Sequence, residues 1–139
     1  MILEYEYYSW EKIIELVSQL AEEILKTNRR YSKIIGVERG GIVPAVLLSR
    51  KLKIKRIAIL PIFRKKLITE DFPLFDKDSY YLIVDDIYDT GSTYSKIIEK
   101  IDANICDFAF LITRYEHKFG FTGEVIQHNR WIQFPWETV

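Results

Sequence analysis

Three acidic residues lie close together near the middle of the 139-residue chain, in the stretch 84–89. Asp85 and Asp86 directly follow an apolar run, and Asp89 comes four residues after the first of them. Carboxylate oxygens accept hydrogen bonds from sugar hydroxyls and bind Mg²⁺, directly or through water. Adjacent acids at the end of a buried strand cannot both point into the core. At least one is therefore expected to face the crevice at the carboxyl edge of a sheet, where ligands of open α/β folds bind.

A loop rich in hydroxyl groups follows the acids at once, with Thr90, Gly91, Ser92 and Thr93. Backbone N–H groups and hydroxyls at the start of a helix form a ready site for a phosphate monoester. Together with the carboxylates they suit a ribose 5-phosphate. The alternative is structural, since two acids could merely end a strand and the loop could merely cap a helix. A receiver-like domain also has paired acids, but these are split between strands, and no phosphate-binding loop follows them.

A second loop with glycines, Arg39-Gly40-Gly41, follows another short β-branched run. Glycines let backbone amides approach a polyanion closely, and Arg39 can supply positive charge at the same place. On its own, this pattern is explained as well by an ordinary tight turn between a strand and a helix.

A third group of residues could bind a flat heterocycle. Arg114 ends a predicted strand, and the C-terminal tail contains Trp131-Ile132 and Trp136. An aromatic ring stacks on a heterocycle, and a cation at a neighbouring strand end can donate to an exocyclic oxygen. Core packing or a subunit contact is the alternative for the tryptophans. We favour that alternative for Trp136 and stacking for Trp131.

The elements that must position these residues follow from the apolar periodicity. Ser9 is a good N-cap for an amphipathic helix over residues 10–27. Strand and helix patterns then alternate, which predicts a parallel sheet covered by helices on both faces. The expected strands cover residues 33–37, 56–62, 80–84 and 107–113, and the other expected helices cover residues 42–52 and 92–101.

Two stretches depart from this alternation. Residues 63–79 are too polar for core and predict a long exposed connection, which is usually functional or disordered. Residues 120–139 contain two tryptophans, two phenylalanines and a proline, and predict an aromatic-rich flap. The chain length and its 48% apolar content favour one domain over residues 1–139.

The overall charge and the cysteine content exclude several classes of function. Lys and Arg total 20, as do Asp and Glu, so no global field would attract nucleic acid or an anionic membrane. The lone Cys106 supports neither a disulfide framework nor a thiolate metal site. No apolar run approaches the ~18 residues of a membrane span, and the N-terminus lacks a signal-peptide pattern. A cytoplasmic protein with a small-molecule substrate is expected.

The stretch VDDIYDTGST resembles the signature of the type I phosphoribosyltransferases. The Arg39-Gly40-Gly41 loop is similar to the pyrophosphate loop of the xanthine-guanine and related purine enzymes, and the tail resembles their purine site. The resemblance covers nearly the whole chain. It implies an α/β fold whose central, mostly parallel sheet is flanked by helices, with a small C-terminal hood formed mainly by about residues 115–139.

The resemblance also implies a role for each residue of these motifs. Asp85 and Asp86 would bind the ribose hydroxyls and Mg²⁺, and the loop from Asp89 to Thr93 would hold the 5-phosphate of phosphoribosyl pyrophosphate. Asp89 would also approach the imidazole nitrogen of the purine as general acid or base. Arg39 and Gly40 would contact pyrophosphate.

The base itself would be held by Arg114, Trp131 and Ile132, with the carbonyl of Ile132 facing its 2-position. One departure is that the family usually has a lysine followed by proline where this chain has Arg114-Tyr115, which changes reach and geometry. The mobile loop of the family is short here, in residues 63–79. Its charge run of Arg64, Lys65 and Lys66 could touch pyrophosphate, but we favour a solvated face.

The implied activity joins a 6-oxopurine (hypoxanthine, guanine or xanthine) to phosphoribosyl pyrophosphate in purine salvage, by a homodimer or homotetramer. Two alternatives stay open. One is a phosphoribosyltransferase for a pyrimidine such as uracil or orotate. The other is a noncatalytic regulator that binds phosphoribosyl pyrophosphate, although Asp89 and the lack of a basic face argue against it.

Overall fold

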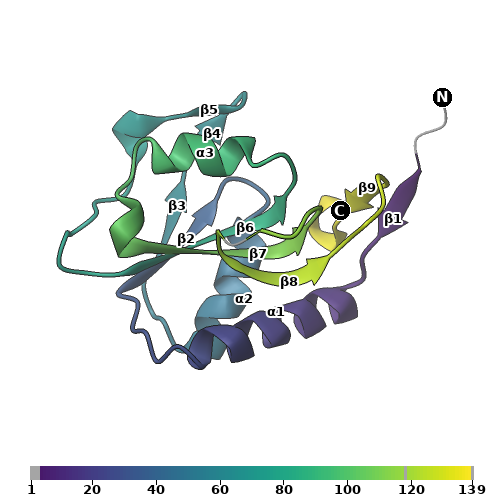
Figure 1. Cartoon of the computed structure of the whole chain (residues 1–139), viewed down its shortest axis with the longest axis horizontal. Coiled ribbons are helices and arrows are strands. Elements are labelled where there is room, and N and C mark those ends of the chain that lie inside the picture. The colour runs from purple at the N-terminus through teal and green to yellow at the C-terminus, as the bar shows by residue number, and fades with distance from the viewer. Residues whose placement is uncertain (1–3, 118, 139) are drawn as a thin grey trace.

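The computed structural model describes residues 4–117 and 119–138, so residues 1–3, 118 and 139 lie outside the description that follows. A five-stranded sheet with the order β3-β2-β6-β7-β8 forms its centre, and every neighbouring pair is parallel (Figure 1). The strands are β2 (Lys33–Val37), β3 (Ile57–Leu60), β6 (Tyr81–Tyr88), β7 (Cys106–Thr113) and β8 (Phe121–Val125).

The order of the strands reverses direction between β2 and β6. From β2 the chain crosses through a helix to β3 on one side, whereas β6, β7 and β8 follow one another on the other side. Loops after β2 and β6 therefore leave the sheet in opposite directions. Such a switch point opens a crevice at the carboxyl ends of the strands, where ligands of open α/β sheets bind.

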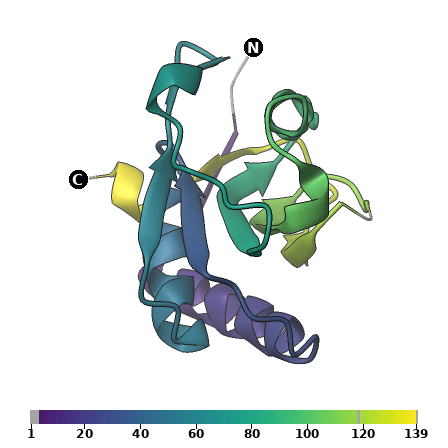
Figure 2. The same ribbon diagram turned by 90° about the vertical axis from the view of Figure 1, so that its left-hand side faces the viewer.

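Helices cover both faces of the sheet, as predicted. Helices α1 (Trp10–Leu25) and α2 (Ile42–Leu52) lie together on one face, and α3 (Ser92–Ile98) lies on the other (Figure 2). The Ser9 side chain accepts a hydrogen bond from Lys12 N–H and so caps α1. The apolar stripe of α1 is buried against the sheet and comprises Ile13, Leu16, Val17, Leu20, Ala21 and Ile24.

Side chains of the central strands alternate between two cores. On β6, Leu82 and Val84 pack with α1 and α2, while Tyr81 and Ile83 pack on the face of α3 with Phe108. A strand buried on both faces needs apolar residues at every position. This requirement explains the continuous apolar runs of the sequence.

Strand β6 is longer than the apolar pattern predicts. It continues through Tyr88, and it pairs with β7 at Asp85↔Phe110 and Ile87↔Ile112. The acidic pair therefore lies inside the strand rather than after it. Pairing with an apolar neighbour extends the strand through two residues whose own preference for strands is low.

The stretch expected to be a long connection contains structure of its own. A short hairpin, β4 (Ile62–Phe63) and β5 (Lys66–Leu67), turns at Arg64 and Lys65, which have φ values of 50° and 63°. The 3₁₀ turns of the chain are η1 (Thr69–Asp71), which follows the hairpin, η2 (Ala103–Ile105) before β7, and η3 (Pro135–Glu137) near the C-terminus.

The hood is built from both ends of the chain. Strand β1 (Tyr5–Tyr7) pairs in parallel with β9 (Trp131–Gln133), so residues 5–7 and 131–133 lie side by side (Figure 1). Residues 121–125, which were expected within the hood, join the main sheet as its edge strand β8. Among the described residues, no helix is both long and apolar enough to cross a membrane.

Candidate functional site

A cavity of about 560 Å³ opens at the switch point of the sheet. Three segments surround it: the end of β6 with the loop that follows, the loop after β2, and the β4–β5 hairpin. It brings together Asp85, Asp86, Asp89 and the predicted phosphate loop with Gly40. Residues of the acidic motif, the hydroxyl loop and the glycine loop thus face one volume, as expected for a ligand site in this class of sheet.

The carboxylates of Asp85 and Asp86 are fixed by the backbone of their own strand. Asp85 Oδ1 accepts from Asp86 N–H at 2.8 Å, and Asp86 Oδ1 accepts from Ile87 N–H at 2.8 Å. Burial raises the pKa of Asp85 well above its ordinary value, and the neighbouring charge of Asp86 raises it further. Burial also raises the pKa of Asp86. The two half-buried carboxyl groups line the cavity, where they can bind a cation or accept hydrogen bonds from hydroxyl groups.

The donor chemistry fits Mg²⁺. This ion prefers oxygen ligands and is commonly held by one or two carboxylates together with substrate phosphates and water. Within residues 4–117 and 119–138, no three acidic, histidine or cysteine side chains gather into a metal cluster. Asp85 and Asp86 are the adjacent carboxylates at the cavity that could hold such an ion.

The loop after β2 packs directly on the acidic pair. A Cβ atom added at Gly40 would lie 2.0 Å from Asp86 Oδ2, so only glycine leaves space for this carboxylate. Gly41 is equally confined, since an added Cβ would lie 2.2 Å from the carbonyl oxygen of Val84. The peptide bond between Glu38 and Arg39 is cis, and the Arg39 side chain is exposed. Two motifs that are 46 residues apart, Gly40 and Asp86, thus make one contiguous surface.

The predicted phosphate loop is open to the cavity. Gly91 has φ of 84°, and an added Cβ would lie 2.4 Å from the Tyr88 hydroxyl oxygen, so glycine is required on both grounds. Ser92 N–H donates to Thr90 Oγ1 at 3.2 Å, and Ser95 N–H donates to the Gly91 carbonyl at 2.9 Å. Thr90, Ser92 and Thr93 are exposed at the start of α3, where their hydroxyls can meet an anion.

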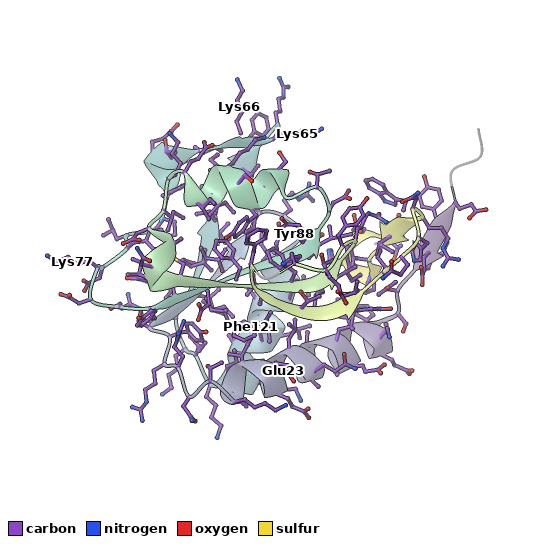
Figure 3. The ribbon with its side chains drawn as sticks, viewed as in Figure 1. Glu23, Lys65, Lys66, Lys77, Tyr88 and Phe121 are labelled. Carbon is purple, nitrogen blue, oxygen red and sulfur yellow. The ribbon has the colours of Figure 1, made fainter. Side chains whose placement is uncertain are left out.

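Two lysines, one on the hairpin and one on α3, line the cavity, although the sequence favoured a solvated face for Lys65 and did not single out Lys96. Lys65 and Lys96 both face the cavity, and Lys96 Nζ donates to the Lys65 carbonyl at 2.9 Å. At the other end of the hairpin, Ile62 N–H donates to Glu38 Oε1 at 3.2 Å. Figure 3 shows Lys65 at the hairpin tip and Tyr88 beneath α3. The helical spacing of Lys96, one turn after Ser92, was the available signal for it.

Arg114 lies against the acidic loop, not free at a strand end. Its Nε is 3.1 Å from Asp89 Oδ1, and its Nη1 and Nη2 each donate at 3.0 Å, to the carbonyls of His128 and Arg130. The Arg114 side chain is 12% exposed and that of Asp89 is 56% exposed. The two residues predicted to meet the base are therefore joined to each other.

The other predicted base contacts are on β9 of the hood. Trp131 is 54% exposed, so its ring is free to stack, whereas the Ile132 side chain is buried. Trp131 N–H donates to the Glu4 carbonyl at 2.9 Å, and Tyr8 N–H donates to the Gln133 carbonyl at 3.0 Å. Because alternate residues of a parallel strand bond to the same neighbour, the backbone groups of Ile132 face away from β1.

Comparison with known proteins adds independent information about this arrangement. The phosphoribosyl transferase domain family matches residues 5–114. A xanthine-guanine phosphoribosyltransferase of Idiomarina loihiensis is 30% identical over 145 residues, covering 94% of this chain and 86% of the relative. The enzyme of that name from Desulfotalea psychrophila is 32% identical over 142 residues, covering 94% of this chain and 84% of the relative.

A solved structure gives the same result at the level of the fold. The purine phosphoribosyltransferase of Pyrococcus horikoshii superimposes with a TM-score of 0.75 at 27% identity, covering 97% of this chain and 95% of that chain. The likeness therefore extends over the sheet, the helices and the hood, and includes every segment that surrounds the cavity.

Proposed function

The chain belongs to the phosphoribosyl transferase domain family, and from this premise we propose that it is a purine salvage enzyme. It joins a 6-oxopurine base (hypoxanthine, guanine or xanthine) to phosphoribosyl pyrophosphate, giving the nucleoside monophosphate and pyrophosphate. The family match over residues 5–114 supports the transferase, and the names of the relatives at about 30% identity support the purine.

One observation carries the proposal. The Asp86 carboxylate packs against Gly40. The acidic pair, the glycine loop and the hydroxyl loop therefore all line one cavity of about 560 Å³. Phosphoribosyl pyrophosphate has a ribose with a phosphate at C5 and a pyrophosphate at the anomeric carbon. The carboxylates that line the cavity can accept hydrogen bonds from the ribose hydroxyls, and the glycine loop and the hydroxyl loop that also line it suit the two phosphate-bearing ends of the substrate.

Each part of the substrate has a proposed set of contacts. Asp85 and Asp86 bind the ribose hydroxyls, and Arg39 and Gly40 contact pyrophosphate. The 5-phosphate is held by the backbone and hydroxyl groups of the loop after β6, which are those of Asp89, Thr90, Gly91, Ser92 and Thr93. Mg²⁺ bound at Asp85 and Asp86 would supply positive charge against the pyrophosphate.

The base lies between the hood and the acidic loop in this proposal. Trp131 stacks on its ring, the carbonyl of Ile132 faces its 2-position, and Arg114 offers a donor to its 6-oxo group. A guanidinium has five N–H donors. Within the protein, Nη1 and Nη2 of Arg114 each make one hydrogen bond and Nε is paired with Asp89, so the group keeps donor capacity for the base.

The reaction then needs alignment and charge stabilisation rather than a covalent enzyme intermediate. The bond from the anomeric carbon to pyrophosphate breaks while a nitrogen of the base bonds to the same carbon, and its proton passes to Asp89. Negative charge grows on the departing pyrophosphate, beside Arg39. Holding base and sugar in line replaces a bimolecular encounter and supplies much of the rate.

The remaining proposals concern the molecule as a whole. We place residues 1–139 in one domain, working in the cytoplasm, and assembled as a homodimer or homotetramer. Ile57 and Ile59 on the edge strand β3 are 44% and 45% exposed, and Val46 on α2 is 40% exposed. Apolar side chains grouped at a sheet edge support a contact between copies.

The test is pyrophosphate release from phosphoribosyl pyrophosphate and Mg²⁺, with six bases supplied one at a time. Release with hypoxanthine, guanine or xanthine, and not with adenine, uracil or orotate, is the expected result. Pyrophosphate release with uracil or orotate alone would show that the substrate is a pyrimidine base and not a purine. Binding of phosphoribosyl pyrophosphate without release for any base would make the protein a noncatalytic regulator.

A further inference from the structure

We propose that Arg114 is a positioning residue that sets the distance between the Asp89 carboxylate and the ring of Trp131. The inference rests on the proposed function, in which these two side chains contact the base from different sides. It assigns to Arg114 a role that works through Asp89 and through the hood, in addition to any direct contact with the base.

The contacts of Arg114 join its own segment to two others that are distant in the sequence, residues 88–89 and residues 128–130. Its backbone N–H donates to the Tyr88 carbonyl at 3.0 Å, which fixes the residue beside the end of β6. Its Nε lies 3.1 Å from Asp89 Oδ1 on the acidic loop. Its two Nη atoms donate at 3.0 Å to the carbonyls of His128 and Arg130, in the loop that leads directly into β9.

The hood loop, residues 128–130, is also held by β1. Glu6 on β1 pairs with the side chains of His128 and, at 3.2 Å, Arg130. The loop therefore has contacts with both Glu6 and Arg114, and Trp131 is the next residue along the chain. A movement of the Arg114 guanidinium would therefore shift the start of β9 and with it the stacking ring.

Only arginine can make this set of bonds. A guanidinium presents its donors in a planar fork that points in several directions at once, whereas a lysine ammonium is a single point on a flexible stem. The Arg114 side chain itself is largely buried, at 12% exposed, although its partner Asp89 is 56% exposed. A lysine at this position would keep a cation for the 6-oxo group but would lose the link between Asp89 and the hood loop.

The first experiment is a double-mutant cycle with Arg114→Lys and Asp89→Asn, measuring kcat and the KM for the base. We expect Arg114→Lys to lower kcat by about 10- to 100-fold, since a displacement of about 1 Å at a reacting group has effects of this size. In the Asp89→Asn background the same change should lower kcat by less than about threefold. Residues that act through one another have non-additive effects.

The control for the cycle is Arg29→Lys. Arg29 pairs with Asp107 at 2.7 Å, outside the cavity, and its replacement should leave kcat and both KM values unchanged. Effects of Arg114→Lys and Asp89→Asn that multiply, or an effect of Arg114→Lys on the KM of the base alone, would overturn the proposal in favour of a direct contact only.

The second experiment is independent of activity and measures amide hydrogen exchange without substrate. Trp131 N–H should exchange at least about 10-fold faster in Arg114→Lys than in the wild type or in Arg29→Lys, because the hood loop loses two bonds. If Arg114→Lys does not fold, Asp89→Ala is measured in its place. Asp89 is exposed, and its replacement removes the ion pair that holds the Arg114 guanidinium at the acidic loop. Unchanged exchange at Trp131 would overturn the proposal even if the enzyme is active. If Trp131 N–H exchanges faster in Arg114→Lys but the wild type transfers no purine, the positioning role of Arg114 is supported and the proposed function is rejected.

Discussion

Asp85 and Asp86 occupy a position that opposes their own ionisation. Burial raises the pKa of both carboxyls, and the charge of Asp86 adds to the effect on Asp85. An acid whose pKa is raised in the folded state stabilises the fold while protonated, below its ordinary pKa. This contribution is lost as the pH rises through the raised value. Residues that bind a cationic or hydroxyl-rich ligand thus destabilise the protein in its absence.

Asp85→Asn is therefore expected to stabilise the fold while removing turnover. At pH 7 to 8 its free energy of unfolding should exceed that of the wild type by about 1 kcal/mol, because a buried charge is lost. The difference should vanish as the pH falls toward the ordinary carboxyl range near 4. Denaturant unfolding across this pH range measures it, with the exposed Asp71→Asn as control. A loss of stability at neutral pH would contradict the expectation.

Trp131 tests the base site at the same scale. Trp131→Ala should raise the KM of the base by about 10-fold or more and leave that of phosphoribosyl pyrophosphate nearly unchanged, since stacking on one base is worth about 1 to 3 kcal/mol. Trp10 is a matched control, because it is 49% exposed, close to the 54% of Trp131, and packs instead near Trp136. Equal changes in both KM values would make Trp131 structural.

Among the elements, the β4–β5 hairpin is the one that departs most from the apolar pattern of the sequence. It bridges the two sides of the cavity, through Ile62 to Glu38 and through Lys65 to Lys96 on α3. The turn at Arg64 and Lys65 has two residues with positive φ, which matches the twist of a two-residue hairpin. Hydrogen bonds near both ends of this short hairpin can hold the Lys65 side chain at the cavity, so a long loop is not needed to place a positive charge there.

Lys96→Met removes the hydrogen bond from α3 to the hairpin while retaining an unbranched apolar stem. We expect the KM of phosphoribosyl pyrophosphate to rise by about fivefold. This corresponds to about 1 kcal/mol of binding free energy, which is typical for the loss of an exposed hydrogen bond made by a charged group. Lys66→Met on the same hairpin is the control, because Lys66 is exposed and lies outside the set of cavity-lining side chains. An equal effect from both changes would indicate general electrostatic attraction rather than a fastened hairpin.

At the scale of the whole molecule, substrate binding and stability are linked through the cavity. The loops around the cavity come from both sides of the switch point, so a ligand that contacts all of them ties together elements that otherwise meet only through the sheet. A ligand that binds only the folded state stabilises that state by mass action.

Phosphoribosyl pyrophosphate with Mg²⁺ should therefore raise Tm more than either alone. At about 100 times its Kd a ligand adds about 2.7 kcal/mol to the free energy of unfolding. In Asp85→Asn the increment due to Mg²⁺ should largely disappear, since one of the two proposed ligands is gone. Thermal unfolding with each component singly and together measures this. The same increment in Asp85→Asn and the wild type would remove that residue from the metal site.

The sequence alone determined the fold class, the order of its main elements and two of the loops that face the cavity, those after β2 and β6. These follow from local signals, such as the helical spacing of apolar residues after Ser9 and the continuous apolar strand before Asp85. The predicted parallel sheet flanked by helices is confirmed by the structure and by the solved relative. The glycines at positions 40 and 91 could also be identified from the sequence, because only a residue without a side chain fits where other groups approach the backbone so closely.

Only the tertiary structure decided which distant residues meet. The pairing of β1 with β9, the contact of Gly40 with Asp86 and the bonds from Arg114 to Asp89 and the hood loop join segments far apart in the chain. No local periodicity encodes them, since they depend on the register of the sheet and on how its edges are covered. A strand of three residues such as β1 has too few positions to show an alternation, and forms because β9 lies beside it.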